Sequence, residues 1–246
     1  MAVIRATGAC GSGVVWRCPN SRPDAALAAI QSDGGVDGLE AGEDQLGFGP
    51  VIARKQPGRR FWSFVEKMIP NLTIRLDRLE LVAATKELLQ AEDDLPELAR
   101  CLQADVPGNW PMPLYDNDAR QHFLRVLSEN AESVGWTAWY ILLLDDAGRR
   151  TLIGSVGACG LPDDSGTIVI GYSLLDQFQG RGYATEALRS FLAWVKPYPR
   201  LRTVVADTFP HLTASIRVLE KNGFVRCGAG TDEGSIRFEL LVHHGG

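Results

Sequence analysis

The segment QFQGRGYATE, residues 177–186, decides how this chain is interpreted. It follows an apolar run at residues 167–175, which predicts a strand, and it precedes residues 184–195, whose apolar side chains recur at helical spacing. Gly180 and Gly182 lie one residue apart, so several backbone N–H groups of the turn can point to one place at the positive end of the helix. This arrangement predicts a cradle for a diphosphate.

Two better-known phosphate-binding turns do not fit the segment. A P-loop requires a lysine after its last glycine, and residues 177–186 contain none. A Rossmann turn requires a third glycine and alternating βαβ units, whereas the strands predicted around this segment include antiparallel hairpins. An earlier glycine-rich stretch, residues 8–13, follows no convincing strand, so it predicts no dinucleotide site either. An ordinary strand-to-helix turn, with glycines needed only for packing, stays open on the segment alone.

Periodic patterns extend outward from this segment. Residues 74–82 alternate like a strand, and a break near Arg78 is interpreted as a β-bulge. Residues 85–103 and 116–130 predict two amphipathic helices, separated by a proline-containing loop. The remaining strands are predicted at residues 137–144, 151–159, 167–175, 203–208, 225–227 and 236–242, and the remaining helices at residues 184–195 and 214–222. The order β-αα-βββ-α-β-α-ββ predicts a mixed α/β (α+β) fold.

Residues 1–70 differ in composition from residues 71–246. The first stretch is rich in glycine, proline, aspartate and serine, and its apolar residues occur only in short pieces. Such a composition seldom buries enough apolar surface to offset the entropy of the chain. We therefore expect a poorly structured extension followed by one folded domain, with Met68 as an alternative start of the native protein.

Charge and composition exclude several classes of partner and site. The formal net charge is −5 and the isoelectric point is near 5.4, so no nucleic-acid partner is expected. No run of 18 apolar residues is present, and the N-terminus lacks the apolar core of a signal peptide, so no membrane association is expected. The 5 cysteines and 4 histidines show no metal-ligand spacing. We expect free thiols, no metal and a cytoplasmic protein.

Several segments resemble the GNAT superfamily of N-acetyltransferases. Gln177-x-x-Gly180-x-Gly182 is similar to the Gln/Arg-x-x-Gly-x-Gly/Ala signature of that family. The other similar segments are residues 74–81, 170–175, 182–188 and 215–224, and the resemblance covers residues 71–242. It is closest to the branch that contains ribosomal-protein N-terminal (alanine) acetyltransferases. It implies a GNAT fold, in which a central, mostly antiparallel twisted sheet is splayed between its fourth and fifth strands and flanked by helices.

The resemblance implies that acetyl-CoA is the cosubstrate. Backbone amides of residues 179–184 are expected to hold the pyrophosphate. The edge of the fourth strand is expected to bind the pantetheine arm, where a strand N–H can polarise the thioester carbonyl. The amine acceptor then attacks directly in a ternary complex, and no cysteine serves as a nucleophile. The coenzyme-binding residues implied in this way are Tyr172, Ser173, Leu174, Gln179, Gly180, Arg181, Gly182, Tyr183, Ala184, Thr185 and Ser215.

The chain departs from the family at positions that commonly transfer protons. Many members have a glutamate on the fourth strand, where this chain has Val169, and a tyrosine in the last helix, where this chain has Leu219. The asparagine that commonly lies three residues before the helix serine is Leu212 here. Ser215 matches the serine used in the ribosomal-protein branch, so Ser215, as general acid, and Tyr172 are the expected catalytic residues. A capping role for Ser215 at the start of its helix stays open.

Other candidate residues are less specific. His211 and Asp207 are further candidates for proton transfer, and Glu132 is one example of a base from the acceptor half. By analogy with the family, Trp110 and Trp136 are expected on the acceptor side, where packing and substrate contact are equally open.

The missing glutamate bears on the identity of the acceptor. At pH 7 an α-amine is about 10–15% neutral, whereas a lysine amine is only about 0.04% neutral. A site without a strong base therefore favours a peptide or protein N-terminus. A small amine such as an aminoglycoside or polyamine stays open, because acidic residues in the acceptor half can supply an anionic cleft. A non-catalytic acyl-CoA-binding module and a homodimer are also left open. The acidic residues concerned are Asp93, Asp94, Asp116 and Asp118.

Overall fold

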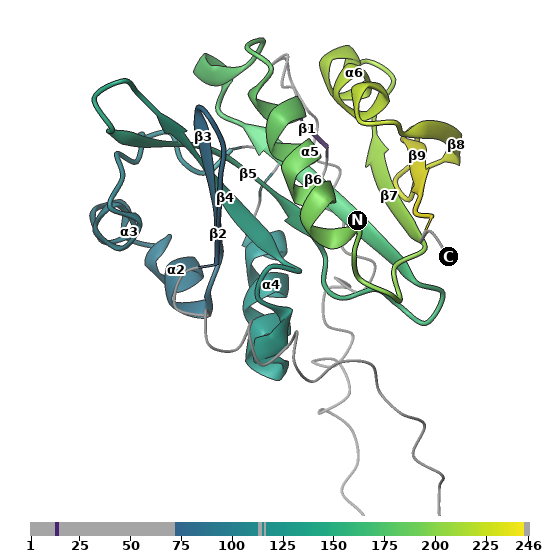
Figure 1. Cartoon of the computed structure of the whole chain (residues 1–246), viewed down its shortest axis with the longest axis horizontal. Helices are drawn as coiled ribbons and strands as arrows, with labels where there is room; N and C mark the ends of the chain where they lie inside the picture. The colour runs from purple at the N-terminus through teal and green to yellow at the C-terminus, as the bar shows by residue number, and fades with distance from the viewer. Residues whose placement is uncertain (1–12, 15–71, 113–114, 116, 244–246) are drawn as a thin grey trace, which may run out of the picture. The chain divides into compact units, whose positions relative to one another are not determined.

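The computed structural model describes residues 13–14, 72–112, 115 and 117–243 (Figure 1). The chain divides into two compact units, and every described residue belongs to the unit made of residues 1–21 and 69–246. The expected extension, residues 1–70, lies outside the described residues apart from Gly13 and Val14. Its boundary with the folded domain stays a prediction.

A nine-stranded sheet runs through the described part of the chain, with its strands in the order β2-β3-β4-β5-β6-β7-β9-β8 and with β1 beside β6. All paired strands are antiparallel except β6 and β7, which are parallel. This arrangement confirms the predicted fold class. The strands are β1 Gly13–Val14, β2 Thr73–Arg75, β3 Leu79–Ala83, β4 Ala138–Leu144, β5 Arg150–Ala158, β6 Thr167–Leu174, β7 Thr203–Thr208, β8 Val225–Ala229 and β9 Ile236–Leu241.

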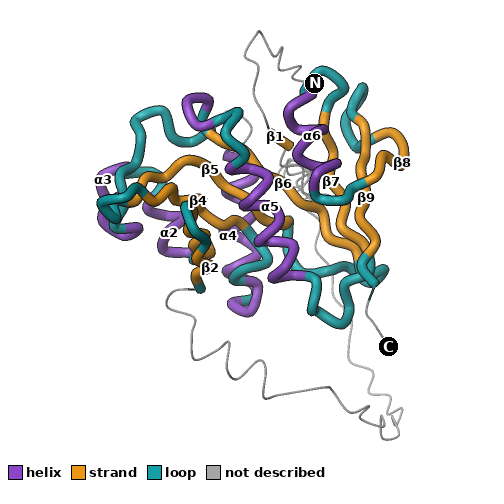
Figure 2. The backbone as a smooth tube through the Cα atoms, turned by 45° about the horizontal axis from the view of Figure 1, so that its top comes forward, coloured by secondary structure: helices purple, strands orange, loops and turns teal. Residues whose placement is uncertain are grey.

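Helices cover both faces of the sheet (Figures 1 and 2). On one face, Leu188 and Phe191 of α5 join a core cluster with strand side chains. On the other face, Leu98 of α3 and Phe123 of α4 join a second cluster. We call these faces the α5 side and the α4 side. The helices are α2 Lys86–Ala91, α3 Leu95–Leu102, α4 Asn117–Glu129, α5 Tyr183–Val195 and α6 Thr213–Lys221, with 3-10 turns η1 Ala131–Ser133 and η2 Asp176–Phe178.

Local sequence explains the two helices nearest the glycine turn. In α5, apolar residues at helical spacing, such as Ala187 and Phe191, are fully buried against the sheet. The helix predicted over residues 214–222 is α6, and it ends at a local signal: Gly223 has a φ of 85°, and the Phe224 N–H donates to the Leu219 carbonyl at 3.1 Å. Both helices are therefore fixed in register beside the turn that connects β6 to α5.

The strand predicted over residues 74–82 was wrong in its details. The chain reverses at residues 76–78, and β2 and β3 pair antiparallel with each other. The Leu76 N–H donates to the Leu79 carbonyl at 2.9 Å, which closes the turn. The interrupted alternation near Arg78 thus marks a hairpin turn and not a bulge.

The single helix predicted over residues 85–103 is also wrong. It is two helices, α2 and α3, separated by a short turn at residues 92–94. Pro96 lies in the first turn of α3, where its missing N–H costs nothing, but a continuous helix would have required that N–H. The apolar spacing continued across the break and concealed it.

The parallel pair β6 and β7 separates along its length. Thr167 pairs with Thr203 and Val169 with Val205, and no pair between these two strands follows. Beyond that level β6 runs on to Leu174, and β7 remains paired with β9. The predicted splay is therefore confirmed, and it leaves a gap beside the second half of β6.

The cysteines differ from the expectation of free thiols. Cys159, which follows β5, is disulfide-bonded, whereas Cys101 and Cys227 are free and exposed. Spacing along the sequence does not report which cysteines meet in space. No helix among the described residues is long and apolar enough to cross a membrane. Within the same ranges, no group of three or more histidine, cysteine or acidic side chains is arranged to hold a metal ion.

Candidate functional site

The turn between β6 and α5 holds its two glycines in the left-handed backbone region. The φ angles of Gly180 and Gly182 are 75° and 82°. Gly182 is the N-cap residue of α5, and no side chain caps this end. The N–H of Glu186 donates to the Gly182 carbonyl, so the amides of the preceding turn have no intrahelical acceptor. A side chain at position 180 would meet no described atom within 4 Å, so an anion can approach the backbone.

Side-chain amides fix the turn to its surroundings. Gln179 donates from Nε2 to the Leu174 carbonyl at 3.0 Å and to Asp176 Oδ1 at 2.9 Å. Gln177 and Asn109 exchange hydrogen bonds of 3.2 and 3.3 Å between their side-chain amides. The first glutamine of the signature therefore connects the turn to the loop before α4.

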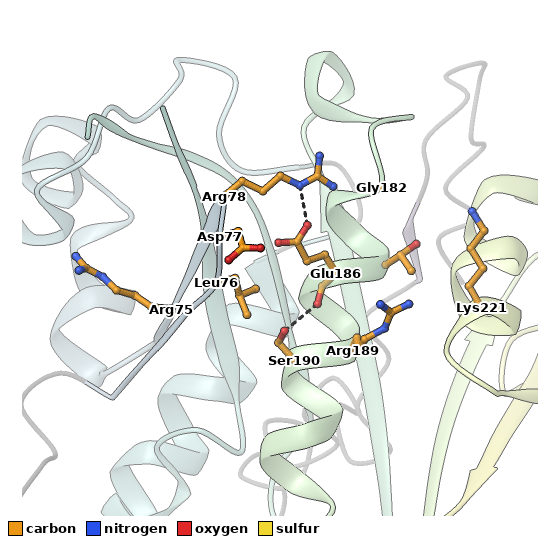
Figure 3. A pocket seen from close by; sticks show the side chains of 10 residues that line it. Arg75, Leu76, Asp77, Arg78, Gly182, Glu186, Arg189, Ser190 and Lys221 are labelled. Atoms are coloured by element: carbon orange, nitrogen blue, oxygen red, sulfur yellow. Dashed lines mark hydrogen bonds and ion pairs between the residues drawn. The ribbon is translucent and has the colours of Figure 1, made fainter. Parts of the chain in front are cut away.

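Arg78, from the turn between β2 and β3, also holds the glycine turn (Figure 3). Its Nε donates to Glu186 Oε2 at 2.8 Å, and its Nη2 donates to the Arg181 carbonyl at 3.2 Å. Its guanidinium carbon lies 4.6 Å from the ring centroid of Tyr183. No local pattern predicts this role for Arg78, because the hairpin between β2 and β3 that carries it resembles an interrupted strand in the sequence.

Basic side chains line two cavities beside the turn. The larger cavity, of about 670 Å³, lies between the β2–β3 turn, α5 and α6, and Arg189 and Lys221 line it (Figure 3). The smaller, of about 170 Å³, lies between Gly182 and α6, where Arg217 and Lys221 line it. None of these three cations forms an ion pair with another described residue. Arg217 and Lys221 are four residues apart on α6, and this spacing is the sequence signal for two cations on one face of the helix.

The structure gathers the predicted coenzyme residues around this turn and the gap beside β6. They come from the end of β6, from the turn itself and from the first turns of α5 and α6. Their role in coenzyme binding stays a prediction. The residues are Tyr172, Ser173 and Leu174 on β6, Gln179, Gly180, Arg181 and Gly182 in the turn, Tyr183, Ala184 and Thr185 on α5, and Ser215 on α6.

The two expected catalytic residues meet in a buried chain of hydroxyl groups. Tyr172 donates to the Ser215 carbonyl at 3.0 Å, and Thr208 donates to Ser215 Oγ at 3.1 Å. The remaining contact joins Ser215 Oγ and the Tyr172 hydroxyl at 3.2 Å, so the Ser215 proton is directed to the Tyr172 oxygen. All three residues are 0% exposed, and burial raises the pKa of Tyr172. Because Tyr172 lies on β6 and Thr208 on β7, these hydrogen-bonded hydroxyl groups bridge the two separating strands.

Of the other proton-transfer candidates, Asp207 is held in an ion pair and His211 is exposed. Burial alone would raise the pKa of Asp207, but hydrogen bonds from Arg237 and Thr231 outweigh it, and the pKa is lowered. Arg237 donates two bonds of 2.7 Å to the two carboxylate oxygens of Asp207. His211 is exposed and stacks on Phe209, with ring centroids 5.6 Å apart. Asp207 on β7 is therefore engaged by Arg237 on β9 and by Thr231.

On the α4 side, a buried carboxyl group lies beneath two tyrosines. Glu92 accepts hydrogen bonds from Tyr140 at 2.7 Å and Tyr115 at 3.1 Å. Burial raises the pKa of Glu92 to about 7, although both tyrosines and Arg120, 3.8 Å away, act in the opposite direction. The ring of Trp110 lies 5.9 Å from that of Tyr140, so Trp110 lies on this side of the sheet. Sequence reasoning did not identify Glu92, because its burial depends on distant strands.

Trp136 does not lie with Trp110. Its ring is 5.3 Å from that of Trp194 on α5 and 4.8 Å from that of Tyr198, within the core of the α5 side. Trp136 and Trp110 therefore belong to different core clusters, and the acceptor-side position of Trp136 stays a prediction. Glu132, the example of an acceptor-side base, is exposed in η1.

Comparison with known proteins gives three kinds of match. Residues 87–225, more than half of the chain, match the family described as acetyltransferase (GNAT) domain. The chain is 26% identical over 153 residues to the uncharacterized N-acetyltransferase YjdG of Bacillus subtilis (strain 168), across 62% of this chain and 89% of that protein. Among solved structures, the ribosomal-protein-S5-alanine acetyltransferase of Vibrio fischeri is 17% identical with a TM-score of 0.48, covering 70% of this chain and 97% of that one. RimL, a ribosomal L7/L12 alpha-N-protein acetyltransferase in complex with coenzyme A, is 20% identical with a TM-score of 0.49, covering 70% and 98%.

Proposed function

The chain belongs to the GNAT acetyltransferase family, and on that premise we propose that it transfers the acetyl group of acetyl-CoA to the α-amine of a peptide or protein. In this reaction the amine nitrogen attacks the thioester carbonyl carbon and the carbon–sulfur bond breaks. The amine loses one proton, and the departing thiolate gains one. One part of the structure supports the proposed coenzyme, and another part supports the proposed acceptor.

The glycine turn carries the coenzyme part of the proposal. Its two left-handed glycines present the uncapped N-terminus of α5, whose amides and dipole favour a diphosphate. Arg217 and Lys221 face the turn across the smaller cavity, and Arg189 with Lys221 lines the larger one. Charge-assisted hydrogen bonds of this kind contribute about 1.5–3 kcal/mol each. The larger cavity, about 670 Å³, has a volume typical of ligand sites and suits the nucleotide end of the coenzyme.

The gap beside β6 supports a position for the reacting thioester. After Val169, β6 has no pairing with β7, so the edge of β6 at Tyr172 and Ser173 faces the gap, where only Gly13 and Val14 among the described residues pair with it. A strand N–H at this edge can polarise a carbonyl oxygen as negative charge develops there. Among the described residues, no cysteine lines either cavity beside the turn, which supports direct attack by the amine. We propose that the hydrogen-bonded hydroxyl groups of Thr208, Ser215 and Tyr172 fix the separation of β6 and β7 and so keep the gap open.

The α-amine is favoured because, among the described residues, no strong base lies beside the gap. β6 carries no carboxyl group along its length, and Asp207 on β7 is bound to Arg237. Glu92 lies on the α4 side of the sheet, where Tyr140 of β4 donates a hydrogen bond to it. Strand β5 lies between β4 and β6. An α-amine is already partly neutral near pH 7, so it depends less on a general base of the enzyme than a lysine amine does.

A thermal-shift titration with acetyl-CoA tests the coenzyme site. The parent is compared with Gly182→Glu and with Gly148→Glu, a control in the β4–β5 turn with a similar φ of 76° and open surroundings. Coenzyme at 100 times its dissociation constant should stabilise the parent and the control by about 2.7 kcal/mol, and Gly182→Glu should lose that gain. No shift in the folded parent would refute the coenzyme site.

A pair of peptides tests the acceptor. One peptide has a free N-terminus and no lysine, and the other has a blocked N-terminus and one lysine. We expect faster acetylation of the free N-terminus, measured by mass spectrometry at pH 7. Faster acetylation of lysine would overturn the choice of acceptor. Coenzyme binding without turnover on either peptide or on a polyamine would indicate a binding module instead.

A further inference from the structure

β6 has a second neighbour on the side that faces the gap. Gly13 pairs with Ser173 and Val14 with Tyr172, in an antiparallel arrangement. Figure 1 draws this short strand, β1, in purple beside β6, and Figure 2 shows it near the same strand and α6. β1 also lies against β7 and α6, so it is inside the gap that the separating strands leave. A segment from the other end of the chain thus occupies this edge.

An open strand edge has a simple chemical requirement. Its N–H and C=O groups need hydrogen-bonding partners, and any extended chain of amides can provide them. β1 provides backbone amides at Tyr172 and Ser173. The pantetheine arm of acetyl-CoA is also an extended chain with two amide groups, and the proposed function places it at the same two residues. The two cannot pair with one edge at the same time.

We propose that β1 is a built-in competitor of acetyl-CoA, which has to leave the edge of β6 before the coenzyme can bind completely. This inference rests on the proposed coenzyme site. The cavity between Gly182, Leu174 and α6 has a volume of about 170 Å³, below the roughly 300–1,000 Å³ of ligand sites. The described part of β1 is Gly13–Val14, which pairs with β6 at two positions.

Such competition lowers the apparent affinity for the coenzyme in a predictable way. The apparent dissociation constant equals the intrinsic one divided by the fraction of molecules in which the edge is free. If β1 occupies the edge in most molecules, its removal should tighten acetyl-CoA binding by about tenfold. The effect appears in coenzyme affinity, and the acceptor site is unchanged.

The test uses the full chain and isothermal titration calorimetry with acetyl-CoA. In the double variant Gly13→Pro with Val14→Pro, proline removes the N–H groups of β1 and prevents strand pairing. The control is Gly35→Pro with Val36→Pro, which changes the same dipeptide elsewhere in the N-terminal region. A reductant is present throughout, so Cys159 is reduced in every sample. We expect about tenfold tighter binding by the double variant and unchanged binding by the control.

Two further measurements do not depend on that variant alone. A synthetic peptide with the sequence of residues 8–19, its cysteines replaced by serine, should weaken acetyl-CoA binding by the double variant, whereas a scrambled peptide should not. In the parent, hydrogen exchange followed by mass spectrometry should speed up at Gly13 and Val14 when acetyl-CoA is added. Protection at Tyr172 and Ser173 should persist, because the coenzyme replaces β1 there.

The outcomes separate this inference from the proposed function. Equal affinity in parent and double variant, with no change in exchange at Gly13 and Val14, would overturn the competition and leave the coenzyme site standing. Weaker acetyl-CoA binding by the double variant would show that β1 contributes to the coenzyme site, and this result would also overturn the proposed competition. No binding by any of the proteins would refute the coenzyme site and the inference with it.

Discussion

The α5 side and the α4 side of the sheet hold their polar groups in opposite ways. On the α5 side, the important groups are backbone amides of the glycine turn and exposed cations such as Arg217 and Lys221, which have no ion-pair partner in the described residues. On the α4 side, Glu92 is buried beneath Tyr115 and Tyr140. The first arrangement suits a charged ligand that arrives from solvent. The second is an internal acid whose charge state depends on pH.

This difference separates recognition from stability. Changes on the α5 side should act on coenzyme affinity and depend on ionic strength, because the cations are exposed and screened. Changes at Glu92 should act on folding and depend on pH, because burial dominates its pKa.

The largest expected effect is the pH dependence of stability that Glu92 causes. Its pKa is about 7 in the folded protein and 4.5 in the reference state. The protonated form is preferred in the folded state, so this contribution is fully present below pH 4.5 and is lost as pH rises through 7. The loss amounts to about 3 kcal/mol. Urea unfolding of the parent and Glu92→Gln between pH 4 and pH 8 should show the variant gaining that amount relative to the parent.

Glu132→Gln is the matched control, since Glu132 is an exposed acid in η1. It should follow the pH dependence of the parent. Acetyl-CoA affinity should be the same in all three proteins at each pH. A change of affinity in Glu92→Gln alone would mean that the two sides of the sheet are coupled, and the separation of recognition from stability would fail.

The next effect concerns the cations of α6. Arg217→Glu combined with Lys221→Glu should weaken acetyl-CoA binding by about 100-fold, or about 2.7 kcal/mol, because two charge-assisted contacts become repulsive. Calorimetry at low and high salt measures it, and the dependence of affinity on salt should be smaller in the variant. Lys196→Glu, at the other end of α5, is the control and should bind as the parent does. An unchanged affinity in the double variant would remove α6 from the coenzyme site.

A smaller effect distinguishes two roles for Ser215. Ser215→Ala leaves the buried hydroxyls of Tyr172 and Thr208 with one partner fewer, which should cost about 2 kcal/mol of stability. If the hydroxyl chain only holds the strands apart, kcat should fall less than tenfold, whereas loss of a general acid costs about 10²–10⁴-fold. A fall of more than 100-fold, with loss of one limb of the pH–rate profile, would restore the expected catalytic role. Ser190→Ala, which loses a single bond to the Glu186 carbonyl, is the control.

The same contrast explains how far sequence alone could predict the structure. The glycine turn, α5 and the end of α6 depend on local signals, such as the left-handed Gly182 and Gly223, and they were predicted almost residue by residue. The hairpin that carries Arg78 was not predicted, because a short turn and a β-bulge interrupt the alternation of apolar and polar residues in the same way. The environment of Glu92 depends on Tyr140, 48 residues away, which no local pattern reports.

The smallest predicted effect concerns Arg78, which connects the β2–β3 hairpin to the glycine turn. It comes from a hairpin that local patterns did not predict, and it contacts the turn that they predicted best. Its ion pair with Glu186 is half exposed and so is worth about 0–1 kcal/mol, and Arg78→Met should change the melting temperature little. Acetyl-CoA affinity should fall by about threefold, because the turn loses the contact with the Arg181 carbonyl and its bound geometry becomes less populated. Calorimetry beside Arg149→Met, which removes an ion pair in the β4–β5 turn, measures the difference. If both variants bind like the parent, the glycine turn is fixed by local sequence alone, and the distant hairpin adds nothing to recognition.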